Sequence, residues 1–223
     1  RDQVLPALTA WYTLRKAWAQ PAPRQRVQIE HRGMLFADWL DQLHHLGDEP
    51  EAGADLGALP PQEPVERAWL ALDPGRLMED LEEGPPRIKK LLGAWVRSLA
   101  AAACDLRVGG RIVGSDATLH IHPMQPEQAR ADLAALIDLW RDGLSAPLPA
   151  ALETGLAQVS DNGKPQEAYE GAKFRRGEVE QDPCLARLFP DYDTLCSHPR
   201  YDEVCETLYR RLADWANDHV AWR

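Results

Sequence analysis

The first apolar positions of the chain recur at the spacing of a helix. In residues 2–19 one stripe carries large apolar side chains, at Val4, Leu8, Trp11, Tyr12 and Trp18. This period predicts an amphipathic helix. Pro21 and Pro23 follow it and would end it.

Alternation then replaces the helical period. Val27 and Ile29 alternate with polar neighbours, which predicts a half-buried strand, and Arg32–Gly33 predicts a turn. Residues 34–45 fit either a helix or a second strand. Because they directly follow a strand and a glycine turn, we favour a strand, and therefore a hairpin.

A buried strand and a helix are predicted next. Residues 67–73, RAWLALD, form a short apolar run that ends at Pro74–Gly75. After Pro85 and Pro86, apolar residues repeat with helical spacing, at Ile88, Leu91, Leu92, Trp95, Val96 and Leu99. This stripe predicts the core face of a helix.

The second half of the chain predicts a hairpin and two further helices. The hairpin spans residues 111–122 around Ser115–Asp116, and the helices span residues 126–143 and about 200–219. Residues 145–198 are expected to form a long region of loops and short helices, and so long a connection is often functional.

Two segments lack both periods. Residues 47–66 are acidic and rich in proline and glycine, which predicts an exposed loop. Residues 167–180, EAYEGAKFRRGEVE, combine Tyr169 and Phe174 with three cations and two glycines. We expect them to form a functional or interface surface; the alternative is a loop that folds back on its own domain.

Length and charge narrow the class of protein. With 223 residues and 44% hydrophobic content, the chain is expected to form a single domain over residues 1–223, and its start at Arg1 suggests a fragment of a larger subunit. A net charge of −10 means that any DNA contact must be local. No apolar run approaches the roughly 20 residues of a membrane helix, and no signal peptide is evident, so a cytoplasmic location is expected.

Candidate chemistry outside these elements is weak. The four cysteines contain no CxxC pair, which favours reduced thiols. His120 and His122 would share one strand face, but no third metal ligand is evident, so neither a metal nor a cofactor is predicted. The helix predicted after Pro85 and Pro86 also has a basic face, which carries Arg87, Lys89, Lys90 and Arg97. Such a face either contacts phosphates or is simply solvated.

The element order and several motifs together resemble a known family. The order is helix, three strands, helix, strand, helix, as in the PD-(D/E)xK nuclease core, an α/β fold with a small mixed sheet flanked by helices. Five stretches occur in the right order: DWLDQL, WLALDPGRL, IKKLLGAWVRSLAAAA, LHIHPMQPEQARADLAALIDLWRDGLSAPLP, and AYEGAKFRRGE followed by DPCLARLF. They resemble the C-terminal domain of the exodeoxyribonuclease V gamma subunit, the RecC family.

The resemblance implies a nuclease-like fold that has lost catalysis. An active site of this class needs an Asp on one strand and an acidic-x-Lys triplet on the next, which hold a divalent cation and polarise the attacking water. Asp41 matches the first position. Asp73 lies near the second, but Pro74, Gly75 and Arg76 follow it, so the lysine is absent and both are interpreted as degenerate remnants.

Three functions remain open at this point. The resemblance implies a non-catalytic domain that guides duplex DNA ends or separated strands together with RecB-like and RecD-like helicase subunits. The alternatives are an active metal-dependent nuclease and a pure protein-interaction scaffold. For the first, DNA or partner contacts are expected at cations in two places, namely Arg87, Lys89, Lys90 and Arg97, and Lys173, Arg175 and Arg176.

Overall fold

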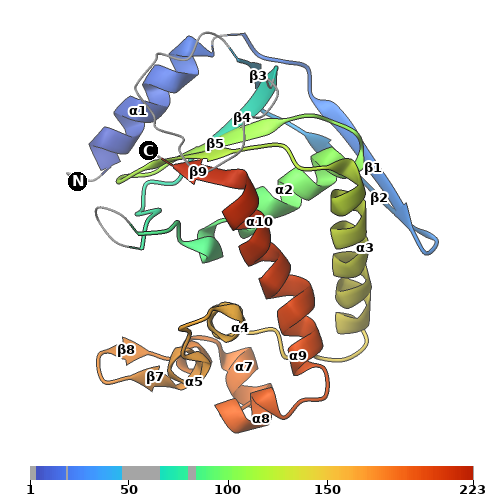
Figure 1. Cartoon of the computed structure of the whole chain (residues 1–223), viewed down its shortest axis with the longest axis vertical. Coiled ribbons are helices and arrows are strands. Elements are labelled where there is room, and N and C mark those ends of the chain that lie inside the picture. The colour runs from blue at the N-terminus through green and yellow to red at the C-terminus, as the bar shows by residue number, and fades with distance from the viewer. Residues whose placement is uncertain (1–3, 19, 47–65, 80–83, 223) are drawn as a thin grey trace. The chain divides into compact units, whose positions relative to one another are not determined.

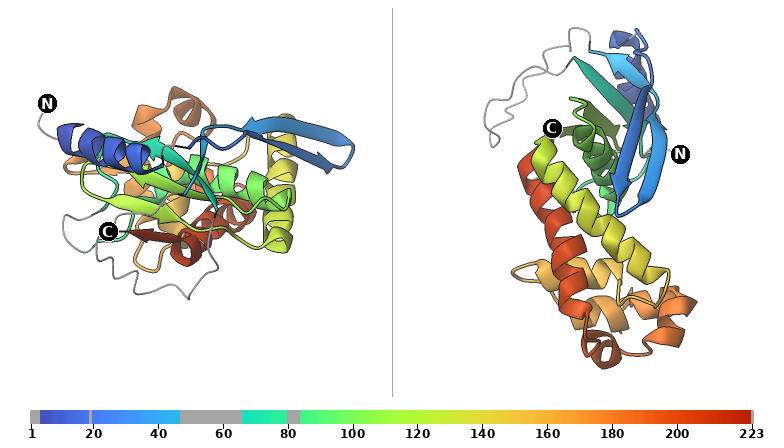
Figure 2. Two further views of the ribbon diagram at one scale, coloured as in Figure 1. Left: turned by 90° about the horizontal axis from the view of Figure 1, so that it is seen from above. Right: turned by 90° about the vertical axis from the view of Figure 1, so that its right-hand side faces the viewer.

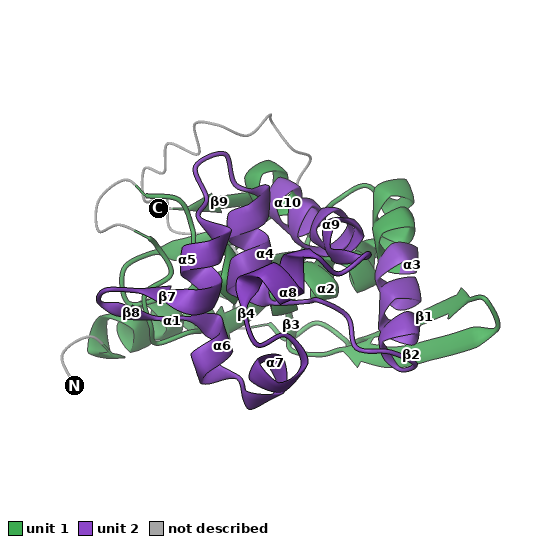
Figure 3. Cartoon of the chain, turned by 90° about the horizontal axis from the view of Figure 1, so that it is seen from below, with its two compact units in different colours: residues 1–133, 215–223 green, residues 134–214 purple. Residues whose placement is uncertain are grey.

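The computed structural model describes residues 4–18, 20–46, 66–79 and 84–222. The acidic segment 47–66 therefore lies outside the described residues, apart from Glu66. The chain divides into two compact units, residues 1–133 with 215–223 and residues 134–214 (Figure 3). Compactness alone does not separate folding units, so the single-domain interpretation stays a prediction.

Unit 1 is built on a mixed sheet. Its strand order in the described residues is β3-β4-β5-β6-β9, with β4 parallel to β5 and all other pairs antiparallel. The strands are β3 (Leu43–His45), β4 (Arg67–Leu72), β5 (Gly109–Val113), β6 (Thr118–Ile121) and β9 (Val220–Trp222). The predicted α/β class, with a small mixed sheet flanked by helices, is confirmed.

Helices pack on this sheet from opposite faces (Figure 1). Leu14 and Trp18, at the C-terminal end of α1 (Val4–Ala17), lie in one cluster with Ala68 and Leu70 of β4. Trp69 alternates with these two residues and faces α2 (Leu92–Ala103), where Arg97 lies 5.0 Å from its ring centroid. The connection β4–α2–β5 is thus a crossover between parallel strands, with the 3-10 turn η1 (Ile88–Lys90) leading into α2.

The faces of these two helices differ in part from the prediction. On α1, Val4, Leu8 and Tyr12 are exposed and Ala7 and Leu14 are buried, whereas Trp18, directly after the helix, is buried as predicted. On α2, Leu91, Trp95 and Leu99 are buried as expected, but Leu92 and Val96 are exposed and small residues take their place, namely Ala94, Ser98, Ala101 and Ala102. A period based on large apolar residues does not detect such small buried side chains.

The predicted N-terminal hairpin forms a separate ribbon in unit 1. Strands β1 (Gln25–His31) and β2 (Met34–Leu40) pair antiparallel along their full length and project from the rest of the unit (Figure 2). The turn residues Arg32 and Gly33 have φ angles of 47° and 76°, values that suit a tight hairpin turn. The preference for a strand over a helix at Met34–Leu40 is confirmed.

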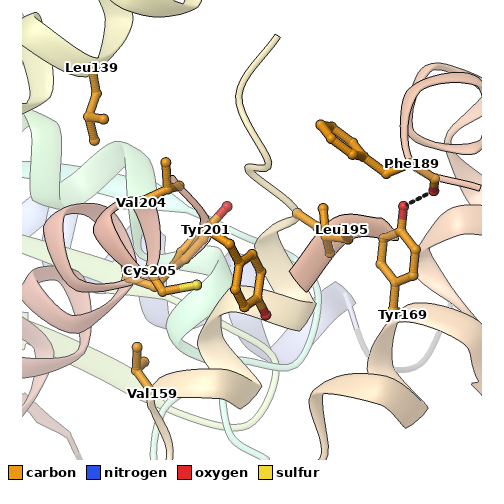
Figure 4. Close-up of a cluster of buried hydrophobic side chains, with 10 residues drawn as sticks. Leu139, Val159, Tyr169, Phe189, Leu195, Tyr201, Val204 and Cys205 are labelled. Carbon is orange, nitrogen blue, oxygen red and sulfur yellow. Dashed lines mark hydrogen bonds between the residues drawn. The ribbon is translucent and has the colours of Figure 1, made fainter. Parts of the chain in front are cut away.

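Unit 2 consists mainly of short helices around a small core. They are α4 (Leu152–Val159), α5 (Pro165–Glu170), α6 (Glu178–Gln181), α7 (Pro183–Leu188), α8 (Tyr192–Cys196) and α9 (Tyr201–Val204), and a two-stranded hairpin of β7 (Gly171–Ala172) and β8 (Arg175–Arg176) lies among them. Their buried side chains include Tyr169, Phe189 and Leu195 (Figure 4). The short helices expected at 145–198 are therefore present.

Two long helices contain residues of both units. One is α3 (Pro126–Gly143), which has the predicted bounds. The other is the predicted C-terminal helix, formed by α9, the π-helical segment η2 (Cys205–Arg210) and α10 (Arg211–His219). Strand β9 follows it and was not predicted, because three residues are too few to display a period.

Candidate functional site

Asp73, the expected remnant of the second catalytic position, lies directly after β4. Its Oδ1 accepts a hydrogen bond from the backbone N–H of Gly75 at 2.9 Å, and its Oδ2 forms an ion pair with Lys90 Nζ at 2.8 Å. Partial burial opposes ionisation, but the hydrogen bonds from Lys90 and Gly75 outweigh it and lower the pKa of Asp73. The carboxylate thus ties the end of β4 to η1.

Asp116, in the turn between β5 and β6, binds the loop after β4 and was predicted from the sequence only as a turn residue. Its carboxylate accepts hydrogen bonds from the backbone N–H groups of Leu77 (2.7 Å) and Met78 (3.2 Å), and Arg76 Nε lies 3.5 Å from it. Partial burial again opposes ionisation, yet these hydrogen bonds lower its pKa. Side-chain capping of backbone donors by Asp is the usual stabilising role of such a residue in a loop.

Asp41, the expected remnant of the first position, is exposed between β2 and β3. Its backbone carbonyl accepts a hydrogen bond from the Arg97 guanidinium. The next residue, Gln42, has a φ angle of 58°, which places a sharp bend here. Within the described ranges, no group of three or more His, Cys, Asp and Glu residues is arranged to hold a metal ion.

Most cations of the predicted basic helix face contact other residues of unit 1. Arg87 donates through Nε to the Met78 carbonyl at 2.9 Å, and Lys90 and Arg97 make the contacts described above. Lys89 is exposed. A role for these four cations in DNA or partner binding stays a prediction.

His120 and His122 do not share one environment. His120 is buried within β6 at 2% exposure. His122 lies beyond the end of β6, where burial first, and then nearby Arg111 and His219, lower its pKa. Each histidine belongs to the packing of the sheet.

The aperiodic segment 167–180 is an ordered hairpin with helices on both sides. Tyr169 is fully buried, and its hydroxyl donates to the Phe189 carbonyl (Figure 4). Gly171 has a φ angle of 91°, and a Cβ on Gly177 would lie 2.2 Å from the Tyr169 carbonyl oxygen. Only glycine satisfies both conditions without strain, so the two glycines close the base of the hairpin.

Acidic side chains hold this hairpin to the rest of unit 2. Glu178 accepts hydrogen bonds from the backbone N–H groups of Glu153 and Thr154 at 3.1 and 3.0 Å, and so caps the first turn of α4. Glu170 accepts one from the N–H of Tyr192 at 3.1 Å, at the start of α8. Arg175 forms an ion pair with Glu153.

The tip of the hairpin is free of such contacts. Phe174 is 93% exposed, and Lys173 Nζ lies 5.3 Å from its ring centroid. Arg176, which pairs with Gly171 in the hairpin, is also exposed, and its guanidinium has no ion-pair or hydrogen-bond partner within the described part of the chain. The two alternatives predicted for this segment therefore apply to different residues. Tyr169 folds back into the core of its own unit, while Phe174 faces solvent.

Comparison with known families decides the relationship. The family model of the RecC C-terminal domain matches residues 1–162. The chain belongs to this family. The resemblance to the exodeoxyribonuclease V gamma subunit is thereby confirmed, and the RecC C-terminal domain connects the chain with DNA repair by a RecBCD complex that contains other subunits. A search of curated proteins finds no match.

The matched part of this RecC C-terminal domain includes Asp41, Asp73 and the cations around α2, and it ends within the loop after α4. The hairpin of unit 2 lies beyond the matched residues, so its own contacts are the evidence for its role. None of the described helices is long and apolar enough to cross a membrane.

Proposed function

We propose that this RecC C-terminal domain is a non-catalytic structural and DNA-guiding part of a RecBCD-type exodeoxyribonuclease V. On a PD-(D/E)xK-like core that has lost catalysis, it helps to split and channel duplex DNA ends in the cytoplasm during double-strand break repair. The observation that carries the proposal is the engagement of Asp73 by Lys90 and Gly75.

A catalytic carboxylate of this class coordinates a hard cation through its oxygens. At Asp73 one oxygen already accepts from Gly75 and the other from Lys90. Pro74 follows at once and occupies the place where a strand with acidic-x-Lys would continue. The residue thus supports a loop rather than a metal ion.

The test compares two remnants in the assembled complex. Asp41→Ala and Asp73→Ala should both leave Mg²⁺-dependent cleavage of linear DNA unchanged, because neither carboxylate acts in the reaction. Asp73→Ala alone should lower thermal stability, since it frees Lys90 and the Gly75 N–H. A loss of cleavage of more than tenfold in both variants, with normal assembly, would contradict the proposal.

One contact favours the alternative of an active nuclease. Lys90 lies 2.8 Å from Asp73, so a lysine reaches this carboxylate although the acidic-x-Lys triplet is absent. If the site is catalytic, Lys90→Met should abolish the same cleavage as Asp73→Ala. Under our proposal Lys90→Met costs stability, about 1 kcal/mol or less for a partly exposed pair, and leaves cleavage intact.

We further propose that the hairpin of unit 2 is the surface through which the domain contacts DNA or the RecB-like and RecD-like subunits. The hairpin carries Lys173 at its tip and Arg175 and Arg176 in β8, and all three are exposed. The double variant Arg175→Ala/Arg176→Ala should reduce DNA unwinding or co-purification of the helicase subunits. Arg187→Ala, which removes an exposed cation of α7 in the same unit, is the matched control.

Salt separates the two kinds of contact. Phosphate contacts make the logarithm of DNA affinity fall linearly with the logarithm of salt concentration, whereas a protein interface responds weakly. If the double variant assembles and unwinds DNA like the unmodified complex, the hairpin has no part in the function.

A further inference from the structure

We propose that the hairpin binds an unpaired nucleotide of DNA, with a base stacked on Phe174 at its tip and neighbouring phosphates held by Lys173 and Arg176. The proposal rests on the proposed DNA-guiding function and adds the ligand that this surface recognises. It also separates the residues that bind DNA from Arg175, which positions the hairpin.

The first argument is the contrast between tip and base. Phe174 is 93% exposed, whereas Tyr169, five residues earlier, is fully buried. The base is fixed by the closely packed Gly177 and by Glu178 on the first turn of α4. A large apolar ring held in water by a fixed base loses little conformational freedom when a flat partner covers it.

The second argument is charge. Every ionisable residue between Gly171 and Gly177 is a cation, in a chain whose net charge is −10. An apolar face beside cations complements a base with its phosphate, because every base has a π-face and every linkage a negative charge. A protein partner with an apolar patch would not require three cations in the same short hairpin.

Arg175 is assigned to positioning of the hairpin rather than to phosphate binding. Its guanidinium is paired with Glu153, and the backbone N–H of Glu153 donates to Glu178. The ion pair ties β8 to the start of α4, and the hydrogen bond ties α6 to the same turn. Lys173 and Arg176 are the cations left for phosphate, since Lys173 lies only against the Phe174 ring and Arg176 has no partner within the described ranges.

The experiment uses the full-length subunit in its complex and single-stranded oligodeoxythymidylate, alone or as the unpaired arm of a fork. Phe174→Ala should weaken binding of the single strand by about 5- to 100-fold, as expected for the loss of one base–aromatic stack. Phe174→Tyr keeps the π-face and should restore binding to within about twofold. Leu144→Ala, which removes an exposed apolar side chain of the same unit, is the control.

A direct readout is photo-crosslinking of oligonucleotides that contain 5-iodouracil, followed by peptide mapping. Crosslinks should fall on Phe174 and disappear in Phe174→Ala. Blunt duplex DNA should give none, because its bases are already stacked. If Phe174→Ala binds the single strand like the unmodified complex and no crosslink maps to residues 171–177, the proposal is wrong, whereas the DNA-guiding function stands if the complex still unwinds DNA.

The salt slope tests the division of labour. Arg176→Ala should reduce the slope of log affinity against log salt by about 0.7, the value for one phosphate contact on a single strand. Arg175→Ala and Glu153→Gln should weaken binding equally and without additivity, at an unchanged slope, because they disrupt one ion pair. If Glu153→Gln instead strengthens binding, Arg175 is itself a phosphate contact. If Phe174→Ala abolishes co-purification of the helicase subunits without affecting DNA binding, the tip binds protein and our assignment fails.

Discussion

Single residues of this chain owe their roles to neighbours that are distant in sequence. Asp73 is paired with Lys90, and His44 contacts Arg15 of α1 and the carbonyl of Trp18 directly after it. The sequence itself shows that no acidic-x-Lys triplet occurs at Asp73. It does not show that Lys90 reaches the Asp73 carboxylate, because no local pattern encodes a contact over that separation.

His44 is the residue for which we expect a pH effect. It is buried at 4% exposure, its Nδ1–H donates to the Trp18 carbonyl at 3.0 Å, and its Nε2 accepts from Arg15 at 2.9 Å. Burial first, and then the Arg15 guanidinium, lower the pKa of His44 below its usual value. The imidazole is therefore neutral in the folded chain, with Nε2 unprotonated.

The sign of the pH effect follows. In the unfolded chain His44 titrates near pH 6.5, so below this pH the unfolded state binds more protons and the free energy of unfolding decreases. The contribution is complete above pH 6.5 and is lost as the pH falls through the lower folded-state value. Urea denaturation at pH 7.5 and 5.5 should show a smaller pH difference for His44→Gln than for the unmodified chain. His45→Gln, at an exposed neighbour, should keep the full difference.

At the scale of elements, the hairpin of unit 2 explains why its sequence displays no period. Four of its residues serve local geometry, because Tyr169 enters the core, Gly171 and Gly177 close the base, and Glu178 caps α4. Each requirement is fulfilled by one residue type at one position. The motif is therefore specific without being periodic.

Two glycines provide a matched prediction at this scale. A Cβ on Gly177 would meet backbone atoms of Tyr169 and Glu170 at 2.2 and 2.4 Å, whereas a Cβ on Gly93 in α2 has nothing within 4 Å. Gly177→Ala should destabilise the chain by about 2 kcal/mol or more, because the backbone must shift. Gly93→Ala should stabilise it by about 0.5–1 kcal/mol through helix propensity.

Chemical denaturation of both variants measures the difference. Gly177→Ala should also weaken binding of single-stranded DNA by the full complex, since it disturbs the base of the hairpin. Equal stability of the two variants would show that the hairpin base is not closely packed.

At the scale of the whole molecule, the chain returns to its first unit at the end. Residues 215–223 belong to unit 1, and β9 pairs with β6 from Leu119↔Trp222 to Ile121↔Val220. Val220 is 2% exposed, while Trp222 is 41% exposed. The last strand thus closes one edge of a sheet that begins near residue 43.

This closure predicts a strong effect from a terminal residue. Val220→Asp should destabilise the chain by about 3 kcal/mol or more, because it places an unpaired carboxylate at a buried position. Trp222→Ala, two residues further along the same strand, should cost about 1 kcal/mol or less. Thermal unfolding followed by circular dichroism checks both, and equal effects would mean that β9 does not pack into unit 1.

The sequence by itself determined the class of fold, most of the elements and the family. Strand β1 and helix α3 follow from periods that cover several residues, and such periods arise because each element buries one face. Strand β2 follows from its place after β1 and a glycine turn, and β4 follows from a short apolar run. The motifs shared with the RecC family determined the relationship. The absence of a lysine after Asp73 was also evident from the sequence.

Only the tertiary structure decided which face of a helix is buried, which carboxylate forms an ion pair with a lysine and which aromatic residue is exposed to solvent. Leu92 and Val96 of α2 have the right period yet are exposed, while the small residues Ala94 and Ser98 are buried. Tyr169 and Phe174 are equivalent in the sequence, but one is buried and the other is 93% exposed. These outcomes depend on contacts between distant segments, and the pattern of a single segment does not contain them.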